Sequence, residues 1–384
     1  MRYCICSDSG MIEADVRVGS YRYLLNQQTL SRRHFMENNK KKVIYLECIR
    51  IISIFFVVFN HTNQHGFFFF PNTDNVIWYL LSIFFSVLCK SAVPLFFMIS
   101  GFLLLGKQET LITVLKNRVL KYGFIILIAS AFTYIANGIY YGNTDFSIRD
   151  IIKIVYRGSD IGTYWFLYSY LGILLMLPFL RGCVQYLTKM NTYYLILLRL
   201  VIIGLLPIVI FVCLGYSMET KIGSPVLQQA VFYCLIGYYF GISENEFKKK
   251  KVRIVGMLLS LLAIAISATM TYYEFIRIGE YSESFFEGLL PIVCITIFGM
   301  VRYYSEKIKE NSRIWKLISF VGDKTFGVYL LEPVLRTYGQ GIWNNLLLIL
   351  PDFVASIVWC VIFVTTGVVI TAIIKLIPGV RKML

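Results

Sequence analysis

The sequence predicts an all-α, polytopic integral membrane protein with about ten transmembrane helices and both termini in the cytoplasm. Three observations support this fold class. The 384-residue chain is 57% hydrophobic and only 15% charged, whereas a soluble domain carries about 25% charged residues. Many apolar runs reach the roughly 20 residues that are needed to cross a bilayer. The lysines and arginines gather in alternate loops between these runs, as the positive-inside rule predicts.

The chain begins with a polar tail, residues 1–38, which lacks the apolar core of a signal peptide. Either this tail is loosely held, or Met36 is the true start of the protein. The rest of the chain, residues 39–384, is predicted to be one membrane domain. Apolar runs predict these ten spans: Val43–Phe59, Ile77–Leu105 with a kink at Pro94, Val119–Tyr140, Thr163–Leu180, Tyr193–Leu214, Val226–Ile242, Val252–Tyr273, Phe286–Tyr303, Leu317–Leu335 and Phe353–Ile377.

The loop charges test this span count. Basic residues precede the first span and follow the second, fourth, sixth, eighth and tenth, while the other loops are neutral, mixed or acidic. The alternation fits ten spans with both ends cytoplasmic. The basic positions are Lys40–Lys42, Lys107, Lys116, Arg118, Lys121, Arg181, Lys189, Lys248–Lys251, Arg253, Lys307, Lys309, Arg313, Lys316, Arg381 and Lys382.

The formal net charge of +15 and the nine cysteines both fit a membrane protein. The charge follows from the basic loops, so it does not indicate a nucleic-acid partner; membrane lipids are the expected surroundings. The cysteines form no CxxC pair, which argues against a disulfide framework or a structural zinc site. His61 and His65 have a spacing that suits a metal, but no third ligand is evident, and no metal cofactor is expected.

Arg50 and His61 are the candidate functional residues of the first span. They are eleven residues apart, about three helical turns, so they share one helix face at a separation of roughly 16 Å. An arginine in an apolar helix is costly in lipid and is expected to face the protein interior or a wet cavity. His61 lies toward the outer side and Arg50 toward the cytoplasm. The following loop carries the run Phe67–Phe70, which suits a membrane interface or an apolar lip.

Four sequence blocks resemble the acyltransferase 3 family of integral membrane O-acyltransferases. They run in the family's order from the first span to the ninth, and the joint pattern is far more specific than any single block. The blocks are Glu47-x-x-Arg50 with His61, Val93–Phe102 (VPLFFMISGF), Tyr164–Tyr168 (YWFLY) with Gly172 and Pro178, and Gly322–Leu330 (GDKTFGVYL).

This resemblance implies transfer of an acyl group, usually acetyl, from cytoplasmic acyl-CoA to a hydroxyl of a surface or lipid-linked glycan. Acetyl-CoA is then a co-substrate, and the multi-pass protein belongs in the cell membrane, as in the cytoplasmic membrane of bacteria. His61 suits the general base, or a transient acyl acceptor, because imidazole titrates near working pH. Arg50 has donors that suit the phosphates of CoA, or it pairs with Glu47. Glu47, as the acidic residue of this block, is a candidate catalytic residue together with His61.

The chain departs from the family pattern in three places. Glu47 stands where aspartate is commoner, which is a mild change. Tyr164 stands where the family often has a histidine, and Glu332 stands where a histidine often precedes proline. A carboxylate in a span is functional or paired by default, so Glu332 is expected to orient His61 or to pair with an arginine. Tyr164, Trp165 and Tyr168 are candidates for the acceptor groove, since aromatic faces suit sugars; core packing explains them equally well.

The same residues also fit roles without catalysis. His61 suits an interfacial histidine, and Ser100-Gly101 fits a helix-packing point better than a nucleophile. The protein could instead be a flippase or transporter for a lipid-linked glycan that makes no bond, or a membrane scaffold. A transporter would tolerate the loss of His61 as long as Arg50 remains, and a scaffold would tolerate the loss of both.

Overall fold

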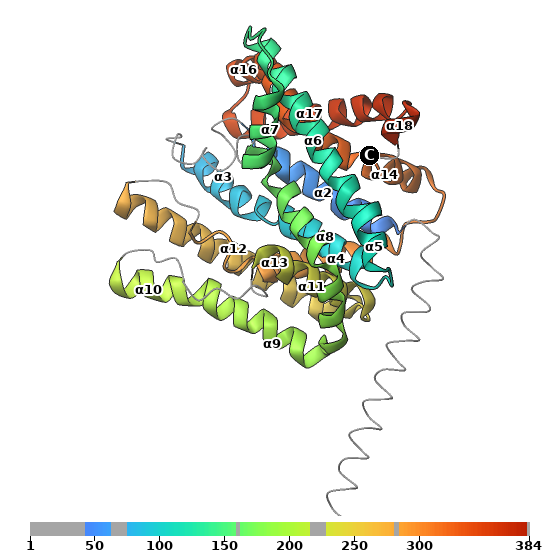
Figure 1. Ribbon diagram of the computed structural model, residues 1–384. Coiled ribbons are helices and arrows are strands. Elements are labelled where there is room, and N and C mark those ends of the chain that lie inside the picture. Colours follow the sequence, from blue (N-terminus) through green and yellow to red (C-terminus); the bar gives the residue numbers. More distant parts are fainter. Residues whose placement is uncertain (1–42, 63–74, 159–161, 216–227, 280–283, 382–384) are drawn as a thin grey trace, which may run out of the picture. The chain divides into compact units, whose positions relative to one another are not determined.

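The computed structural model describes residues 43–62, 75–158, 162–215, 228–279 and 284–381, which form a helical structure without strands in these ranges (Figure 1). The described residues from Ile44 onward belong to one compact unit. The predicted tail and the Phe67–Phe70 run lie outside the described residues. The helices of ten or more residues are α2 (Ile44–Asn60), α3 (Val76–Cys89), α4 (Ala92–Leu105), α6 (Lys121–Tyr140), α7 (Ile148–Arg157), α8 (Trp165–Cys183), α9 (Lys189–Arg199), α11 (Gln229–Ile242), α12 (Lys250–Ile278), α13 (Leu290–Ser305), α14 (Arg313–Gly322), α15 (Thr325–Tyr338), α16 (Gln340–Ile349) and α17 (Asp352–Ile374).

Six helical segments are long and apolar enough to cross a membrane, which agrees with the predicted class of membrane protein. They are Val76–Leu105, Leu111–Tyr140, Gly162–Tyr186, Lys189–Leu214, Lys250–Ile278 and Asp352–Ile374. The other predicted spans coincide with shorter helices, namely α2, α11, α13 and the pair α14 and α15. The number of ten crossings and the side of the termini stay predictions.

Two predicted spans are interrupted. The segment Val76–Leu105 changes from α3 to α4 at Lys90–Ser91, and α14 gives way to α15 at Asp323–Lys324. The span that Pro94 is predicted to kink is interrupted one turn before this residue, because Pro94 has no N–H to donate to the Lys90 carbonyl and instead lies in the first turn of α4. Hydropathy alone could not place these breaks, because the apolar runs continue across them.

Helix α2 is central, because it packs against α3, α4, α13, α14, α15 and α17. Figure 1 shows α2 in the interior of the helical bundle, among these helices. Three of its apolar side chains, Ile49, Ile54 and Val58, are almost completely buried. Arg50 and His61 therefore project from a helix that is enclosed by protein.

Helices α4 and α11 pack backbone against backbone. A Cβ atom at Gly101 would overlap the carbonyl group of Cys234, and one at Gly237 would overlap the backbone of Met98. Small residues let helices approach closely where lipid provides no hydrophobic driving force. This confirms the prediction that Ser100-Gly101 is a packing point. The Ser100 hydroxyl donates a hydrogen bond to the Phe96 carbonyl within its own helix.

Helix α12 carries its apolar side chains outward and its polar ones inward. Leu258, Leu261 and Leu262 are about half exposed, whereas Ser267, Thr271 and Glu274 are fully buried. A helix that faces hydrocarbon needs this arrangement, since polar groups are costly in lipid. The pattern is consistent with a membrane-spanning helix.

Candidate active site

Arg50 is held by a buried carboxylate one turn before it in α2. Its Nη1 atom donates to Oε1 of Glu47 at 2.7 Å, and Glu47 is only 4% exposed. Gly322 at the end of α14 makes this possible, because a Cβ there would overlap the Glu47 side chain. Gly322 of the fourth sequence block is thus in direct contact with Glu47 of the first block. The Glu47 pair fixes Arg50 and leaves its remaining donors for a ligand.

A pocket of about 480 Å³ opens at Arg50 and is strongly basic. Lys107, Arg118 and Lys121 also line it, against the single acid Asp323. Arg118 lies in a π-helical stretch, Leu115–Leu120, which interrupts the regular helix just before α6. Such π-bulges redirect side chains and occur often at functional sites. This charge suits a ligand with several phosphate groups.

The loop between α4 and α5 (Leu111–Val114) anchors the basic rim of this pocket. Glu109 accepts two hydrogen bonds from Arg118, at 2.6 and 2.9 Å, and a third from Arg181 at 2.7 Å. The hydrogen bonds from Arg118 are the largest cause that lowers the pKa of Glu109 to about 2, and Arg181 lowers it further. The carboxylate therefore remains charged throughout the physiological range and fixes both guanidinium groups.

His61 follows α2 directly and faces a carboxylate from α15. Its Nδ1 atom lies 3.4 Å from Oε1 of Glu332, a close ion-pair distance that is longer than a good hydrogen bond. Glu332 is 1% exposed, whereas the His61 side chain is 28% exposed. A carboxylate at Nδ1 favours the tautomer that leaves Nε2 free as a base. The geometry resembles the base and orienting acid of a catalytic dyad.

Two further groups hold Glu332 in place. The Thr163 hydroxyl donates to Oε2 at 2.8 Å, and Arg336, one turn later in α15, places Nε 3.2 Å from Oε1. The Tyr329 hydroxyl in turn donates to the Thr163 carbonyl. A buried carboxylate is tolerated when it is paired and hydrogen-bonded in this way. Glu332 is thereby fixed in position before any ligand arrives.

A small pocket of about 100 Å³ lies at His61. Its polar lining includes Lys90, Thr163, Gln229 and Glu287, and Trp165 forms part of its wall. The pocket has room for a short acyl group beside a hydroxyl, whereas a long acyl chain would need several times this volume. The sequence reasoning missed Lys90 and Glu287, because neither belongs to a recognised block.

Phe166 and Tyr329 line both the Arg50 pocket and the His61 pocket. Their rings meet edge to face at 5.7 Å between centroids. One aromatic wall therefore separates a basic pocket at one end of α2 from the histidine pocket at the other.

The predicted acceptor residues have different surroundings. Trp165 lines the His61 pocket and is 44% exposed. Tyr164 is buried behind it, and its hydroxyl donates to the Leu330 carbonyl. Tyr168 donates to the Val155 carbonyl at 2.8 Å and so ties α8 to α7. The predicted substrate contacts of all three residues stay predictions, as do the catalytic roles of His61, Glu47 and Glu332 and the donor-binding role of Arg50.

Comparison with known proteins identifies the family. No curated protein and no solved structure gives a significant match. The sequence profile of the acyltransferase 3 family, described as an acyltransferase domain, matches residues 43–375. This match includes all four blocks, both pockets and nearly every described helix. The chain therefore belongs to the acyltransferase 3 family.

Proposed function

We propose that this protein is a membrane O-acyltransferase that moves an acetyl group from acyl-CoA to a hydroxyl of a surface or lipid-linked glycan. The observation that carries the proposal is a pair of pockets along α2 that share Phe166 and Tyr329. One is basic, and the other is lined by His61, whose Nδ1 atom faces the buried Glu332. The family match supports acyl transfer.

The donor belongs in the Arg50 pocket. Arg50, Arg118 and the neighbouring lysines offer several cations to the phosphates of CoA, and the rings of Tyr122 and Phe326 offer apolar surface to the rest of the molecule. The roughly 16 Å between Arg50 and His61 in an ideal helix is comparable with an extended pantetheine arm. The thioester then reaches His61 while the nucleotide stays at the basic end.

The acceptor belongs at the His61 pocket, where Trp165 offers an aromatic face to a sugar. Nε2 of His61 takes the proton of the acceptor hydroxyl as its oxygen attacks the thioester carbonyl. The carbon–sulfur bond breaks, the ester forms, and the CoA thiolate takes up the proton. Glu332 stabilises the imidazolium during this step. The small volume at His61 favours acetyl over a long acyl group.

Mass spectrometry of the surface glycan with and without the gene tests the proposal. We expect an acyl ester on the glycan that disappears when the gene is deleted and returns with the parent gene. The His61→Ala gene should restore no ester at equal protein abundance. Persistence of the ester after deletion would overturn the proposed function, and its restoration by His61→Ala would indicate a role without bond formation.

A further inference from the structure

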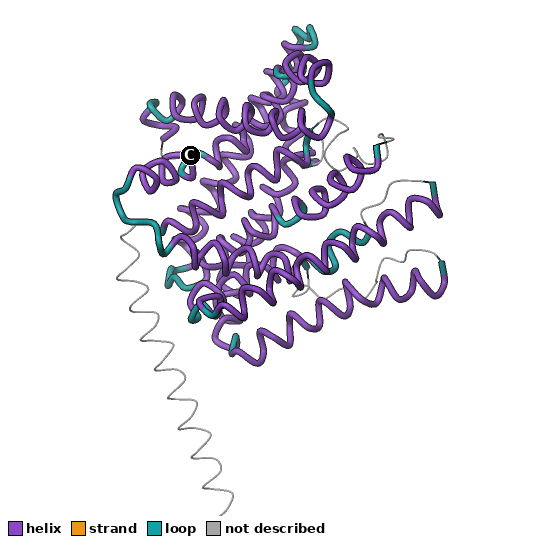
Figure 2. Tube along the Cα trace, turned by 180° about the vertical axis from the view of Figure 1, so that it is seen from behind, coloured by secondary structure: helices purple, strands orange, loops and turns teal. Residues whose placement is uncertain are grey.

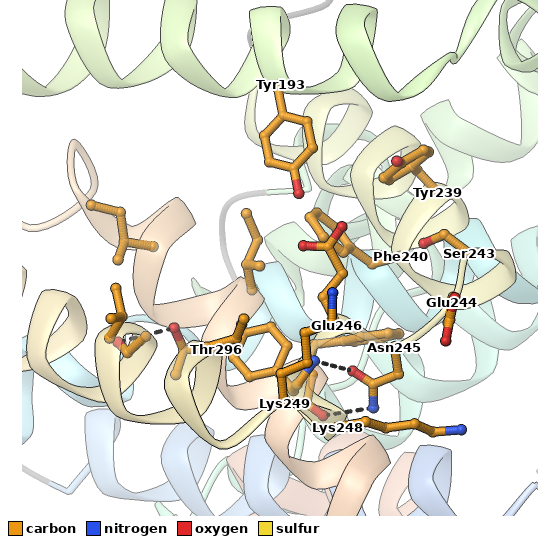
Figure 3. A pocket seen from close by; sticks show the side chains of 18 of the residues that line it. Tyr193, Tyr239, Phe240, Ser243, Glu244, Asn245, Glu246, Lys248, Lys249 and Thr296 are labelled. Atoms are coloured by element: carbon orange, nitrogen blue, oxygen red, sulfur yellow. Dashed lines mark hydrogen bonds between the residues drawn. The ribbon is translucent and has the colours of Figure 1, made fainter.

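A third pocket, of about 780 Å³, is larger than either pocket of the candidate active site and shares no lining residue with them. It lies between α9, α11, α12 and α13 (Figure 3). Most of its walls are apolar, with Ile196 on α9, Val255 and Leu259 on α12, and Ile292 and Ile295 on α13. This pocket is therefore spatially distinct from the candidate active site.

Helix α9 forms one wall of the pocket and contacts its neighbours near both ends. At one end Lys189 pairs with Glu246 at 2.8 Å. At its last residue, Arg199 lies over the ring of Phe232 on α11, 4.9 Å from the ring centroid. Further along, after the π-helical stretch Leu200–Leu205 begins, Gly204 approaches the backbone of Gly288 closely. Figures 1 and 2 both show α9 and α10 (Leu206–Leu214) as one rod beside α12. An apolar gap between such helices in a bilayer is accessible to an acyl chain.

The rim of this gap is basic. Lys189, Lys248, Lys249 and Lys251 line it, against Glu244 and Glu246. Lys189 is paired with Glu246, and Lys248 lies 3.6 Å from Glu306. Lys249 and Lys251 are exposed and form no ion pair within the described ranges. Two lysines are thus available to an anion at the mouth of an apolar slot.

Polar side chains lie between the rim and the slot. Tyr193 extends from α9 toward Phe240 and Glu246, with Ser243 and Tyr239 nearby (Figure 3). Phe298, on the inner wall, contacts Tyr45 at the start of α2 with 5.7 Å between ring centroids. The pocket is therefore at the Arg50 end of α2, the end that the loop charges assign to the cytoplasm. Hydroxyl and aromatic groups at this depth suit a lipid head-group region.

We propose that this cavity binds a glycerophospholipid with an anionic head group. One acyl chain occupies the apolar slot between α9 and α12, and the phosphate lies at Lys249 and Lys251. Basic pockets between transmembrane helices bind anionic head groups in this manner. A free phosphate ion would leave the apolar slot unfilled, and a zwitterionic lipid would gain less from the two lysines. The bound lipid closes the gap that α9 leaves beside α12.

Fluorescence quenching by brominated lipid tests this site. Tyr193→Trp places an indole at the slot, and Leu259→Trp places one on the opposite wall in case the first variant folds poorly. Each full-length variant is reconstituted in phosphatidylcholine vesicles that contain, as a minor component, brominated phosphatidylglycerol or brominated phosphatidylcholine. The quenching of the new indole is the difference between the fluorescence quenching of the variant and that of the parent protein, because the parent has five tryptophans of its own.

We expect brominated phosphatidylglycerol to quench the new indole much more strongly than its mole fraction in the bilayer would produce by random mixing. Combining Lys249→Gln with Lys251→Gln should lower this preference by about fivefold per lysine. Lys309→Gln with Lys316→Gln, which removes the same charge outside the pocket, should leave the preference unchanged. Equal quenching by both lipids, or an equal loss in the two double variants, would overturn the proposal. Neither outcome depends on acyl transfer.

Discussion

The Nδ1 atom of His61 lies 3.4 Å from Oε1 of Glu332, which joins the end of α2 to the middle of α15. This contact brings together two ionisable residues that are far apart in the sequence. One is partly exposed in a small pocket, and the other is completely buried and held by Thr163. The arrangement gives a histidine a fixed partner at one nitrogen and leaves the other nitrogen for substrate.

Glu332→Gln is expected to lower acyl transfer by about 10²-fold, because the amide no longer stabilises the imidazolium or fixes its tautomer. Donor affinity should change little, since Glu332 does not line the Arg50 pocket. Turnover and equilibrium acyl-CoA binding of the purified protein measure the two effects. Arg336→Gln is the matched control, because it removes the other ion-pair partner of Glu332. It should lower the rate of acyl transfer by less than about tenfold. Equal losses in both variants would contradict the orienting role.

Arg50→Gln is expected to weaken acyl-CoA binding and also to destabilise the protein by about 1–3 kcal/mol, because buried Glu47 loses its charged donor. The double variant Glu47→Gln with Arg50→Gln should regain most of the stability without regaining donor affinity. Thermal unfolding in detergent and acyl-CoA binding measure both quantities. Normal donor binding by the double variant would show that Arg50 serves only as a partner of Glu47.

Gly322→Ala is expected to lower both stability and donor affinity, because the new methyl group would overlap Glu47 and displace Arg50. Overpacking of this kind costs about 1–3 kcal/mol. Gly341→Ala is the control, since a Cβ there meets nothing nearby. Thermal unfolding and acyl-CoA binding should separate the two variants clearly. Similar behaviour of both would mean that the contact between α14 and α2 does not set the position of Arg50.

The Glu109 cluster predicts a pH dependence of stability. The pKa of Glu109 is lowered from 4.5 to about 2 in the folded protein. The stabilisation that the charged Glu109 side chain gives the fold is therefore fully present above about pH 4.5 and is lost as the pH falls toward 2. Glu109→Gln should therefore lower the melting temperature at neutral pH, and the difference from the parent should shrink below pH 4.5. Asp150→Asn, which removes an exposed pair with Lys153, should have little effect at any pH. If the melting temperatures of Glu109→Gln and the parent protein differ by a constant amount down to about pH 2, the result would contradict the lowered pKa of Glu109.

The sequence was sufficient to predict the class of membrane protein and the outstanding residues of α2. Arg50 and His61 are conspicuous because ionisable groups are rare in apolar runs, and Glu332 stands out in α15 for the same reason. The spacing of Arg50 and His61 in one helix also predicts that they share a face. These inferences depend only on local pattern and on the cost of charge in lipid.

The rest of the site depends on contacts between helices, which local pattern does not reveal. Lys107, Arg118 and Lys121 were explained by membrane topology alone, yet they line the Arg50 pocket. Phe166 and Tyr329 belong to the third and fourth sequence blocks, but only the packing of the helices places them between the two pockets. Lys248, Lys249 and Lys251 of the basic loop likewise line the third cavity beside α9, which no local pattern reveals.

Transfer of labelled acetyl from acetyl-CoA to glycan in membrane vesicles with the cytoplasmic face outward tests the central claim most directly. The parent protein should label the glycan. His61→Ala, at equal abundance and with an unchanged melting temperature, should label it at least about 10²-fold more slowly. Labelling by His61→Ala at the parent rate would contradict the account, because the small pocket would then hold a histidine that takes no part in the reaction.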